Sequence, residues 1–73
     1  MPSKRRAWVV CMRNDGYEVS LERRKIYEVR PDRAAEQHNQ LRVIDESGED
    51  YLFPARYFAR IELSAALRRA LDA

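Results

Sequence analysis

The sequence predicts an all-β protein, a small five-stranded barrel that ends in a short C-terminal α-helix. Three observations lead to this prediction. Short apolar stretches of strand length recur along the 73 residues, and turn-forming residues separate them. The alternation of strands and helices that is typical of a parallel α/β sheet does not occur. A chain of this length forms one domain at most, with a small core.

The first part of the chain contains two stretches with strand character. Residues 7–12 are apolar and rich in β-branched and aromatic side chains, which favour a strand. The sequence Asn-Asp-Gly at 14–16 predicts a turn, because Asn and Asp tolerate the left-handed region and Gly adopts a positive φ without a steric penalty. Residues 17–21 alternate between apolar and polar. We therefore expect one face of a strand to hold Tyr17, Val19 and Leu21.

A charged turn and a further strand follow. Residues 22–25 are all charged, and residues 26–30 read as a strand. Pro31 ends that strand, because proline cannot donate to the hydrogen-bond ladder. The next segment has no strand signal. Asp32 is placed to N-cap a single helical turn, and Asn39 is placed to end it in the left-handed conformation.

The clearest local pattern is a hairpin in the second half of the chain. Residues 41–45 and 50–53 form its two strands, and Gly48 supplies the positive φ of its tight turn. Residues 54–58 are too few for a helix and fit one 3-10 turn. Residues 59–63 predict a last short strand.

The C-terminal segment predicts a short amphipathic helix. Ser64 is a suitable N-cap for the residues that follow. Leu63, Leu67 and Leu71 recur at four-residue spacing and so form one apolar stripe. Because so short a helix is marginal alone in water, we expect the stripe to dock on the barrel or on another chain, as in a weak homodimer.

These predictions divide the chain into three segments. Residues 1–6 form a flexible basic tail, residues 7–63 the barrel, and residues 64–73 the helix, packed on the barrel or on a partner. The predicted core consists of Val9 or Val10, Cys11, Val19, Leu21, Ile26 or Tyr27, Val29, Val43, Phe53, Phe58, Ile61 and Leu67.

Composition excludes several classes of protein. No apolar run approaches the 18 residues of a transmembrane helix, and the run at 7–12 is too short for a signal peptide, so we expect a cytoplasmic protein. The single cysteine excludes an internal disulfide bond. Cys11 and His38 are only two of the four ligands that a structural zinc site takes, so we expect no metal and no cofactor. A net charge of +2 does not require a nucleic-acid partner.

One segment carries a resemblance to a known family. Residues 51–61, YLFPARYFARI, place Pro54 and Tyr57 at the spacing Pro-x-x-Tyr. The segment resembles the end of a Src-homology-3 (SH3) domain, where a strand enters a Pro-x-x-Tyr 3-10 turn and leaves it as the final strand. The resemblance covers residues 41–63 well and residues 7–30 only in strand order, and it implies an SH3-like barrel.

The peptide groove of that family has features that this chain lacks. The groove also uses a tyrosine-rich first loop and a tryptophan at the start of the third strand. Here Arg42 and Val43 stand in that region, and the only tryptophan is Trp8, on the first predicted strand. The resemblance therefore implies the fold more strongly than the groove.

The chain is also similar to a loose class of small bacterial and phage proteins of unknown function. Their pattern is an apolar first strand, then Leu-x-x-Gly-Lys-x-Tyr-x-Val, an acidic glycine hairpin and a Tyr-x-Pro-x-x-x-Phe segment. Arg24 stands where that pattern has glycine. This resemblance implies a bacterial-type barrel and supplies no activity. The matching residues are Leu21, Lys25, Tyr27, Val29, Asp45, Gly48, Tyr51 or Phe53, Pro54 and Phe58.

We expect a binding module rather than an enzyme. The first hypothesis is protein or peptide binding in a shallow aromatic groove lined by Tyr17, Pro54 and Tyr57. In the plainer interpretation, Pro54 and Tyr57 only build the turn that closes the barrel. The alternative function is binding of RNA or single-stranded DNA, with exposed tyrosines as stacking platforms. The candidate tyrosines are Tyr17, Tyr27, Tyr51 and Tyr57. The basic residues for this function are Arg13, Arg23, Arg24, Lys25 and Arg30.

Two other groups of residues are weaker candidates. Cys11 and His38 have the side chains of a nucleophile and a general base. The sequence predicts Cys11 in a buried strand and His38 in a polar loop, so we interpret them as a core thiol and a surface histidine. An acidic cluster lies on the predicted hairpin, and we interpret it as a solvated tip that keeps the sheet edge soluble or meets a basic partner. Its members are Asp45, Glu46, Glu49 and Asp50.

Overall fold

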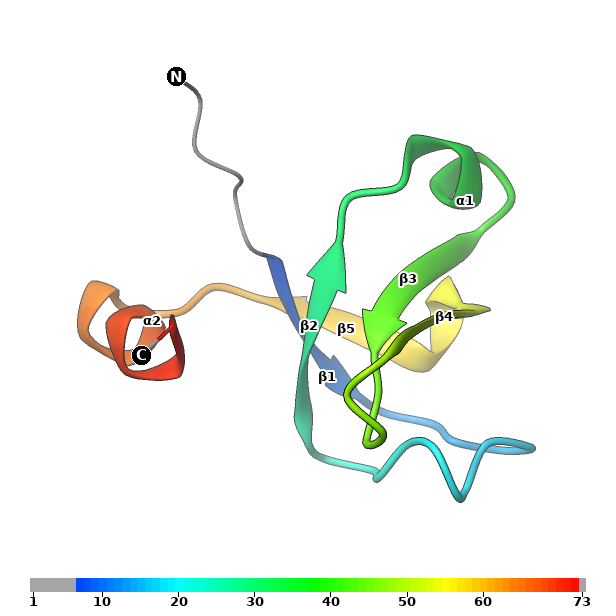
Figure 1. The fold of residues 1–73 in the computed structure, drawn as a ribbon, viewed down its shortest axis with the longest axis horizontal. Helices are drawn as coiled ribbons and strands as arrows, with labels where there is room; N and C mark the ends of the chain where they lie inside the picture. The colour runs from blue at the N-terminus through cyan, green and yellow to red at the C-terminus, as the bar shows by residue number, and fades with distance from the viewer. Residues whose placement is uncertain (1–6, 73) are drawn as a thin grey trace.

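Five short strands form one antiparallel sheet in the order β4-β3-β2-β1-β5 (Figure 1). The structure is a computed structural model that describes residues 7–72. The strands are β1 (Ala7–Cys11), β2 (Ile26–Arg30), β3 (Gln40–Ile44), β4 (Asp50–Pro54) and β5 (Phe58–Ile61). The helices are α1 (Arg33–Gln37), the 3-10 turn η1 (Ala55–Tyr57) and α2 (Ala65–Asp72).

The sheet is curled but is not closed into a barrel. Its two edges are β4 and β5, which do not pair with each other in the part of the chain that the structure describes. Only the three residues of η1 separate these two strands, and a link of that length spans at most about 11 Å. The sheet must therefore bend until its edges approach. The prediction of a mainly β fold with one 3-10 turn and a terminal helix is confirmed.

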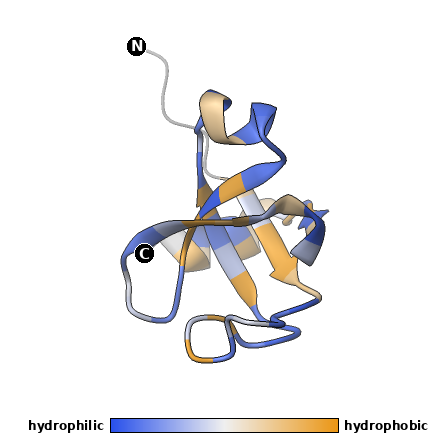
Figure 2. Ribbon diagram, turned by 90° about the vertical axis from the view of Figure 1, so that its right-hand side faces the viewer, coloured by the Kyte–Doolittle hydropathy of each residue, from blue (hydrophilic) through white to orange (hydrophobic). Residues whose placement is uncertain are grey.

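The core fills the concave side of this sheet. Directly opposite residues in an antiparallel pair point to the same face, so β1 places Val9 beside Tyr27, and Cys11 beside Phe58. Along β3, hydrophobic and hydrophilic residues alternate, and the buried positions alternate with them. Figure 2 shows hydrophobic (orange) and hydrophilic (blue) segments within the sheet. The buried cluster contains Val9, Cys11, Leu21, Tyr27, Val29, Leu41, Val43 and Phe53.

The prediction of a strand at residues 17–21 is wrong. The backbone amides of Ser20 and Leu21 both donate to the Tyr17 carbonyl oxygen, at 2.9 and 2.8 Å, so the segment closes on itself as a turn. Leu21 is 1% exposed and Val19 is 95% exposed, although the alternation placed both on one face. Alternation indicates a strand only where a neighbouring strand is available, and this segment pairs with none.

Most of the predicted core is confirmed, and the prediction is wrong at two positions. Val19 and Leu67 are exposed, and Phe58 and Ile61 are only partly buried. Four buried side chains were not predicted: two lie on strands, one on η1 and one on α1. These are Trp8, Ala35, Leu41 and Tyr57.

Local signals placed the caps and turns correctly. Asp32 accepts a hydrogen bond from the Ala35 amide at 3.0 Å and so caps α1. Asn39 and Gly48 have φ values of 60° and 85°. Ser64 accepts a hydrogen bond from the Leu67 amide at 3.1 Å and caps α2.

The apolar stripe of α2 is not covered by the sheet. Leu67 and Leu71 are both exposed, and the helix lies to one side of the strands (Figure 1). Its docking on a partner chain stays a prediction. The basic tail predicted at residues 1–6 lies outside the described residues. Among the described residues, no helix is both long and apolar enough to span a membrane.

Arg24 has a left-handed backbone, with a φ of 68°. Glycine adopts this conformation without steric cost, whereas a residue with a Cβ atom is disfavoured there.

Candidate functional site

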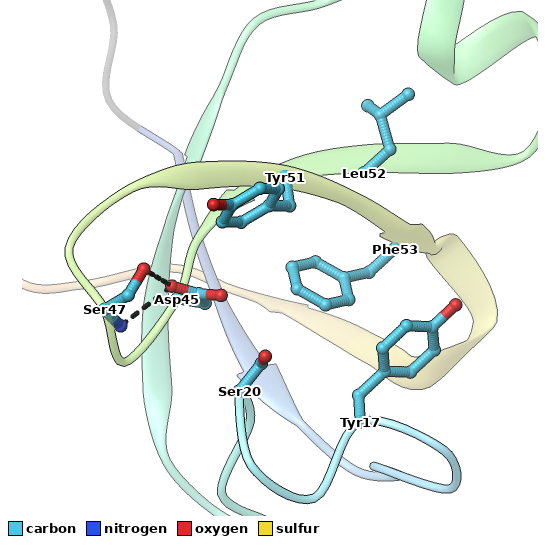
Figure 3. Close-up of a pocket in the computed structure, with 7 residues that line it drawn as sticks. All are labelled: Tyr17, Ser20, Asp45, Ser47, Tyr51, Leu52 and Phe53. Atoms are coloured by element: carbon cyan, nitrogen blue, oxygen red, sulfur yellow. Dashed lines mark hydrogen bonds between the residues drawn. The ribbon is translucent and has the colours of Figure 1, made fainter.

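A pocket of about 430 Å³ opens between the β3–β4 hairpin and the turn at residues 17–20 (Figure 3). We call it the hairpin pocket. It combines aromatic rings, two serine hydroxyl groups and one carboxylate. The residues that line it are Tyr17, Ser20, Asp45, Ser47, Tyr51, Leu52 and Phe53.

Backbone hydrogen bonds hold the two walls of the pocket together. Asp45 closes the hairpin turn with two backbone hydrogen bonds of 3.0 Å. Its amide donates to the backbone carbonyl oxygen of Glu49, and its carbonyl oxygen accepts from the Gly48 amide. The amide of Glu46 donates to the Ser20 carbonyl oxygen at 3.1 Å. This last bond joins the hairpin to the 17–20 turn, so the pocket has two walls from segments far apart in the sequence.

Asp45 forms the polar side of the pocket. Its Oδ1 accepts from the backbone amide of Ser47 at 2.8 Å and from the Ser47 hydroxyl at 2.5 Å. The other carboxylate oxygen turns toward the interior of the pocket (Figure 3). The acidic cluster was interpreted as a solvated tip. This is wrong for Asp45, which is only 7% exposed because the 17–20 turn packs against the hairpin.

Aromatic rings form the rest of the pocket. Phe53 is buried, and Tyr17 meets it edge to face with ring centroids 5.1 Å apart. Tyr51 and Leu52 are exposed on β4. The Tyr51 hydroxyl donates to Glu49 at 2.9 Å, which holds the ring in place.

Tyr57 does not line the hairpin pocket. Its ring is 6.0 Å from that of Tyr17, and its hydroxyl donates to the Asp15 carbonyl oxygen at 2.9 Å. The guanidinium groups of Arg13 and Arg56 lie 5.0 and 5.4 Å from the ring centre. Tyr57 thus ties η1 to the turn at 14–16. Of the three predicted peptide-binding residues, Tyr17 reaches the pocket, whereas Pro54 is partly buried at the end of β4.

The predicted nucleic-acid-binding residues are partly neutralised. Arg13 pairs with Asp15 at 2.7 Å, and Lys25 pairs with Glu46 at 2.6 Å. Arg30 pairs with Asp50 at 3.2 Å. The structure leaves Arg23 and Arg24 exposed at the turn before β2, and neither takes part in an ion pair within residues 7–72.

Below the pocket, a buried tyrosine anchors the hairpin. The Tyr27 hydroxyl donates to Glu46 Oε2 at 2.5 Å and accepts from the Glu22 amide at 2.7 Å. Lys25 Nζ approaches the same oxygen of Glu46. Burial raises the pKa of Tyr27 far above its usual range. The hydrogen bonds from Lys25 and Tyr27 lower the pKa of the Glu46 carboxyl.

We expect Tyr27→Phe to destabilise the protein by about 1 kcal/mol at neutral pH, because a partly buried hydrogen bond is lost and solvent screens its charged acceptor. Since the pKa of Glu46 is lowered by folding, its stabilising effect is present above the ordinary glutamate pKa of 4.5 and is lost as the pH falls through the lower folded value. The difference between wild type and variant should therefore shrink in acid. Denaturation of both proteins at pH 7 and pH 3 measures this difference in the free energy of unfolding. A difference that does not change with pH would contradict the hydrogen bond between Tyr27 and the charged Glu46.

Cys11 and His38 do not form a catalytic pair in the described structure. Cys11 is buried, its thiol donates to the Arg13 carbonyl oxygen at 3.1 Å, and burial raises its pKa. A buried thiol with a raised pKa is a poor nucleophile. His38 is exposed at the end of α1, and no hydrogen bond among the described residues joins it to Cys11. Within residues 7–72, no group of three or more side chains is placed to hold a metal ion.

The hairpin pocket was only partly visible in the sequence. Tyr17 was a candidate for peptide binding and Tyr51 only a candidate for base stacking, whereas Ser20 and Ser47 carried no signal. Asp45 was noticed as part of a charge cluster, and its burial depends on the segment at 17–20. Comparison with family models, with curated proteins and with solved structures finds no match for this chain, so its proposed function rests on its own geometry.

Proposed function

We propose that the protein is a non-enzymatic module that binds an extended peptide in the hairpin pocket. The observation that carries the proposal is the meeting of exposed apolar side chains at a concave surface. Tyr17 and Tyr51 are both exposed, and both line the pocket above the buried ring of Phe53, whereas the side chain of Leu52 borders the pocket but points away from it (Figure 3). Apolar pockets with a few convergent polar groups are typical ligand sites, and tyrosine is well suited to interfaces because its hydroxyl tolerates water.

The position of β4 supports an extended ligand. Tyr51, Leu52 and Phe53 belong to β4, and β4 is an edge of the sheet. An edge strand presents backbone groups that a peptide can pair with as an added strand, while pockets beside the strand select side chains. The pocket and the edge are therefore adjacent parts of one proposed interface.

We also propose that the fold is a partly open SH3-like barrel. The order β4, η1, β5 supports this, because it reproduces the strand, 3-10 turn and final strand that the Pro54 and Tyr57 spacing suggested. The proposed peptide site differs from the predicted groove, since it uses the β3–β4 hairpin rather than Pro54 and Tyr57.

The proposed peptide binding is tested by selecting binders to the immobilised full chain from a random peptide library. We expect Tyr51→Ala to weaken the selected peptides about 30-fold or more, the effect of losing an aromatic hot spot of about 2 kcal/mol. The domain should stay folded, because the Tyr51 side chain is 50% exposed. Val19→Ala is the matched control, since Val19 is apolar and exposed but does not line the pocket. If no peptide is selected, or if both variants weaken binding equally, the proposal fails.

The alternative, binding of RNA or single-stranded DNA, has less support. Of its five basic residues, Arg13, Lys25 and Arg30 already face carboxylates. Salt-sensitive binding of single-stranded DNA at about 50 mM salt, lost on substitution of Arg23 and Arg24, would favour it instead.

A further inference from the structure

The buried carboxylate of Asp45 lacks a cationic partner in the part of the chain that the structure describes. Two of the three other acids of the hairpin differ in this respect. Glu46 faces Lys25, and Asp50 faces Arg30. Asp45 is the most buried of the four acids of the hairpin, yet its hydrogen bonds come only from Ser47. A buried carboxylate is costly unless it is paired and hydrogen-bonded.

The hydrogen bonds from Ser47 satisfy only one of the two carboxylate oxygens of Asp45. Both end on Oδ1, where they shape the hairpin turn. The second oxygen points into the hairpin pocket (Figure 3). A turn that needed only the Oδ1 acceptor would be served equally by asparagine, which has the same acceptor without the charge.

Aromatic rings surround the space that this oxygen faces. Tyr17, Tyr51 and Phe53 line the same pocket as Asp45 (Figure 3). The face of an aromatic ring attracts a cation, and the attraction increases when the cation is partly shielded from water. A carboxylate beside three rings is therefore suited to a positively charged head on an apolar stem.

We propose that the hairpin pocket takes a lysine or arginine side chain of the bound peptide. The stem of that side chain packs on the rings of Tyr51 and Phe53, and its charged head meets the free oxygen of Asp45. The proposal rests on the proposed peptide binding and names the residue class that it selects. The lysine and arginine stems match the apolar lining, because both side chains carry three or four methylene groups.

The experiment uses peptides selected on the full chain and their analogues in which each lysine or arginine is replaced by norleucine. Norleucine keeps an apolar stem and removes the charge. We expect one such replacement to weaken binding about tenfold, as measured by fluorescence anisotropy, because a charge-assisted hydrogen bond is lost. We expect Asp45→Asn to bind the basic peptide and its norleucine analogue equally, since this variant keeps the Oδ1 acceptor and loses the charge.

The outcomes separate the two proposals. If peptides bind but norleucine causes no loss, or if Asp45→Asn still prefers the basic peptide, the basic-residue inference is overturned and peptide binding stands. If no peptide binds the wild-type chain, both fail. Circular dichroism of Asp45→Asn establishes that the variant is folded, and Glu18→Gln is the control for removal of a nearby charge, since Glu18 is exposed and does not line the pocket.

Discussion

Tyr57→Ala should destabilise the protein by about 3–5 kcal/mol, the usual effect of removing a buried aromatic side chain. Tyr57 is 6% exposed, and its ring packs edge to face on Tyr17. The change also removes the hydrogen bond from its hydroxyl to the Asp15 carbonyl oxygen. Native proteins are typically stable by about 5–15 kcal/mol, so the expected loss is a large fraction of the stability. Urea denaturation followed by tryptophan fluorescence measures the loss.

Tyr57→Phe separates the ring from the hydroxyl. It keeps the packing and removes only the bond to Asp15, so we expect a loss of about 1 kcal/mol. A Tyr57→Ala variant that kept its stability within about 1 kcal/mol would contradict the structural role. Tyr57 would then be available to a ligand, as the predicted groove with Pro54 requires.

Leu21→Ala should cost about 2–5 kcal/mol, whereas Val19→Ala should change the stability by less than about 0.5 kcal/mol. The two residues are neighbours in the alternating pattern, and a strand would bury both. In the structure Leu21 packs in the core cluster with Val43 and Phe53, while Val19 projects into solvent at the turn. The free energy of unfolding of the two variants, measured under one set of conditions, tests the turn directly.

The comparison has a clear contrary outcome. Similar losses for Leu21→Ala and Val19→Ala would indicate that residues 17–21 do form a strand with one buried face. That result would also remove a wall of the hairpin pocket, since Tyr17 and Ser20 reach it from this turn. The stability of the core and the proposed site are thus linked through one segment.

The sequence by itself determined the features that depend on residues close together in the chain. The caps at Asp32 and Ser64 and the turn at Gly48 need only backbone groups within three residues, so their chemistry is visible locally. The Pro54 and Tyr57 spacing predicted η1 for the same reason. Consecutive strands pair from β1 to β4, as is usual for antiparallel sheets, whereas the pairing of β1 with β5 joins the two ends of the chain and has no local signal.

Only the tertiary structure decided the features that need a distant partner. Residues 17–21 have the right alternation for a strand but pair with no other, so their own turn hydrogen bonds prevail. Asp45 looks solvated in the sequence and is buried because the turn at 17–20 packs against its hairpin. The stripe at Leu67 is apolar enough to pack, yet the sheet does not cover it. Burial depends on what lies opposite in space, and for these residues that neighbour is far away in the chain or absent from the described fold.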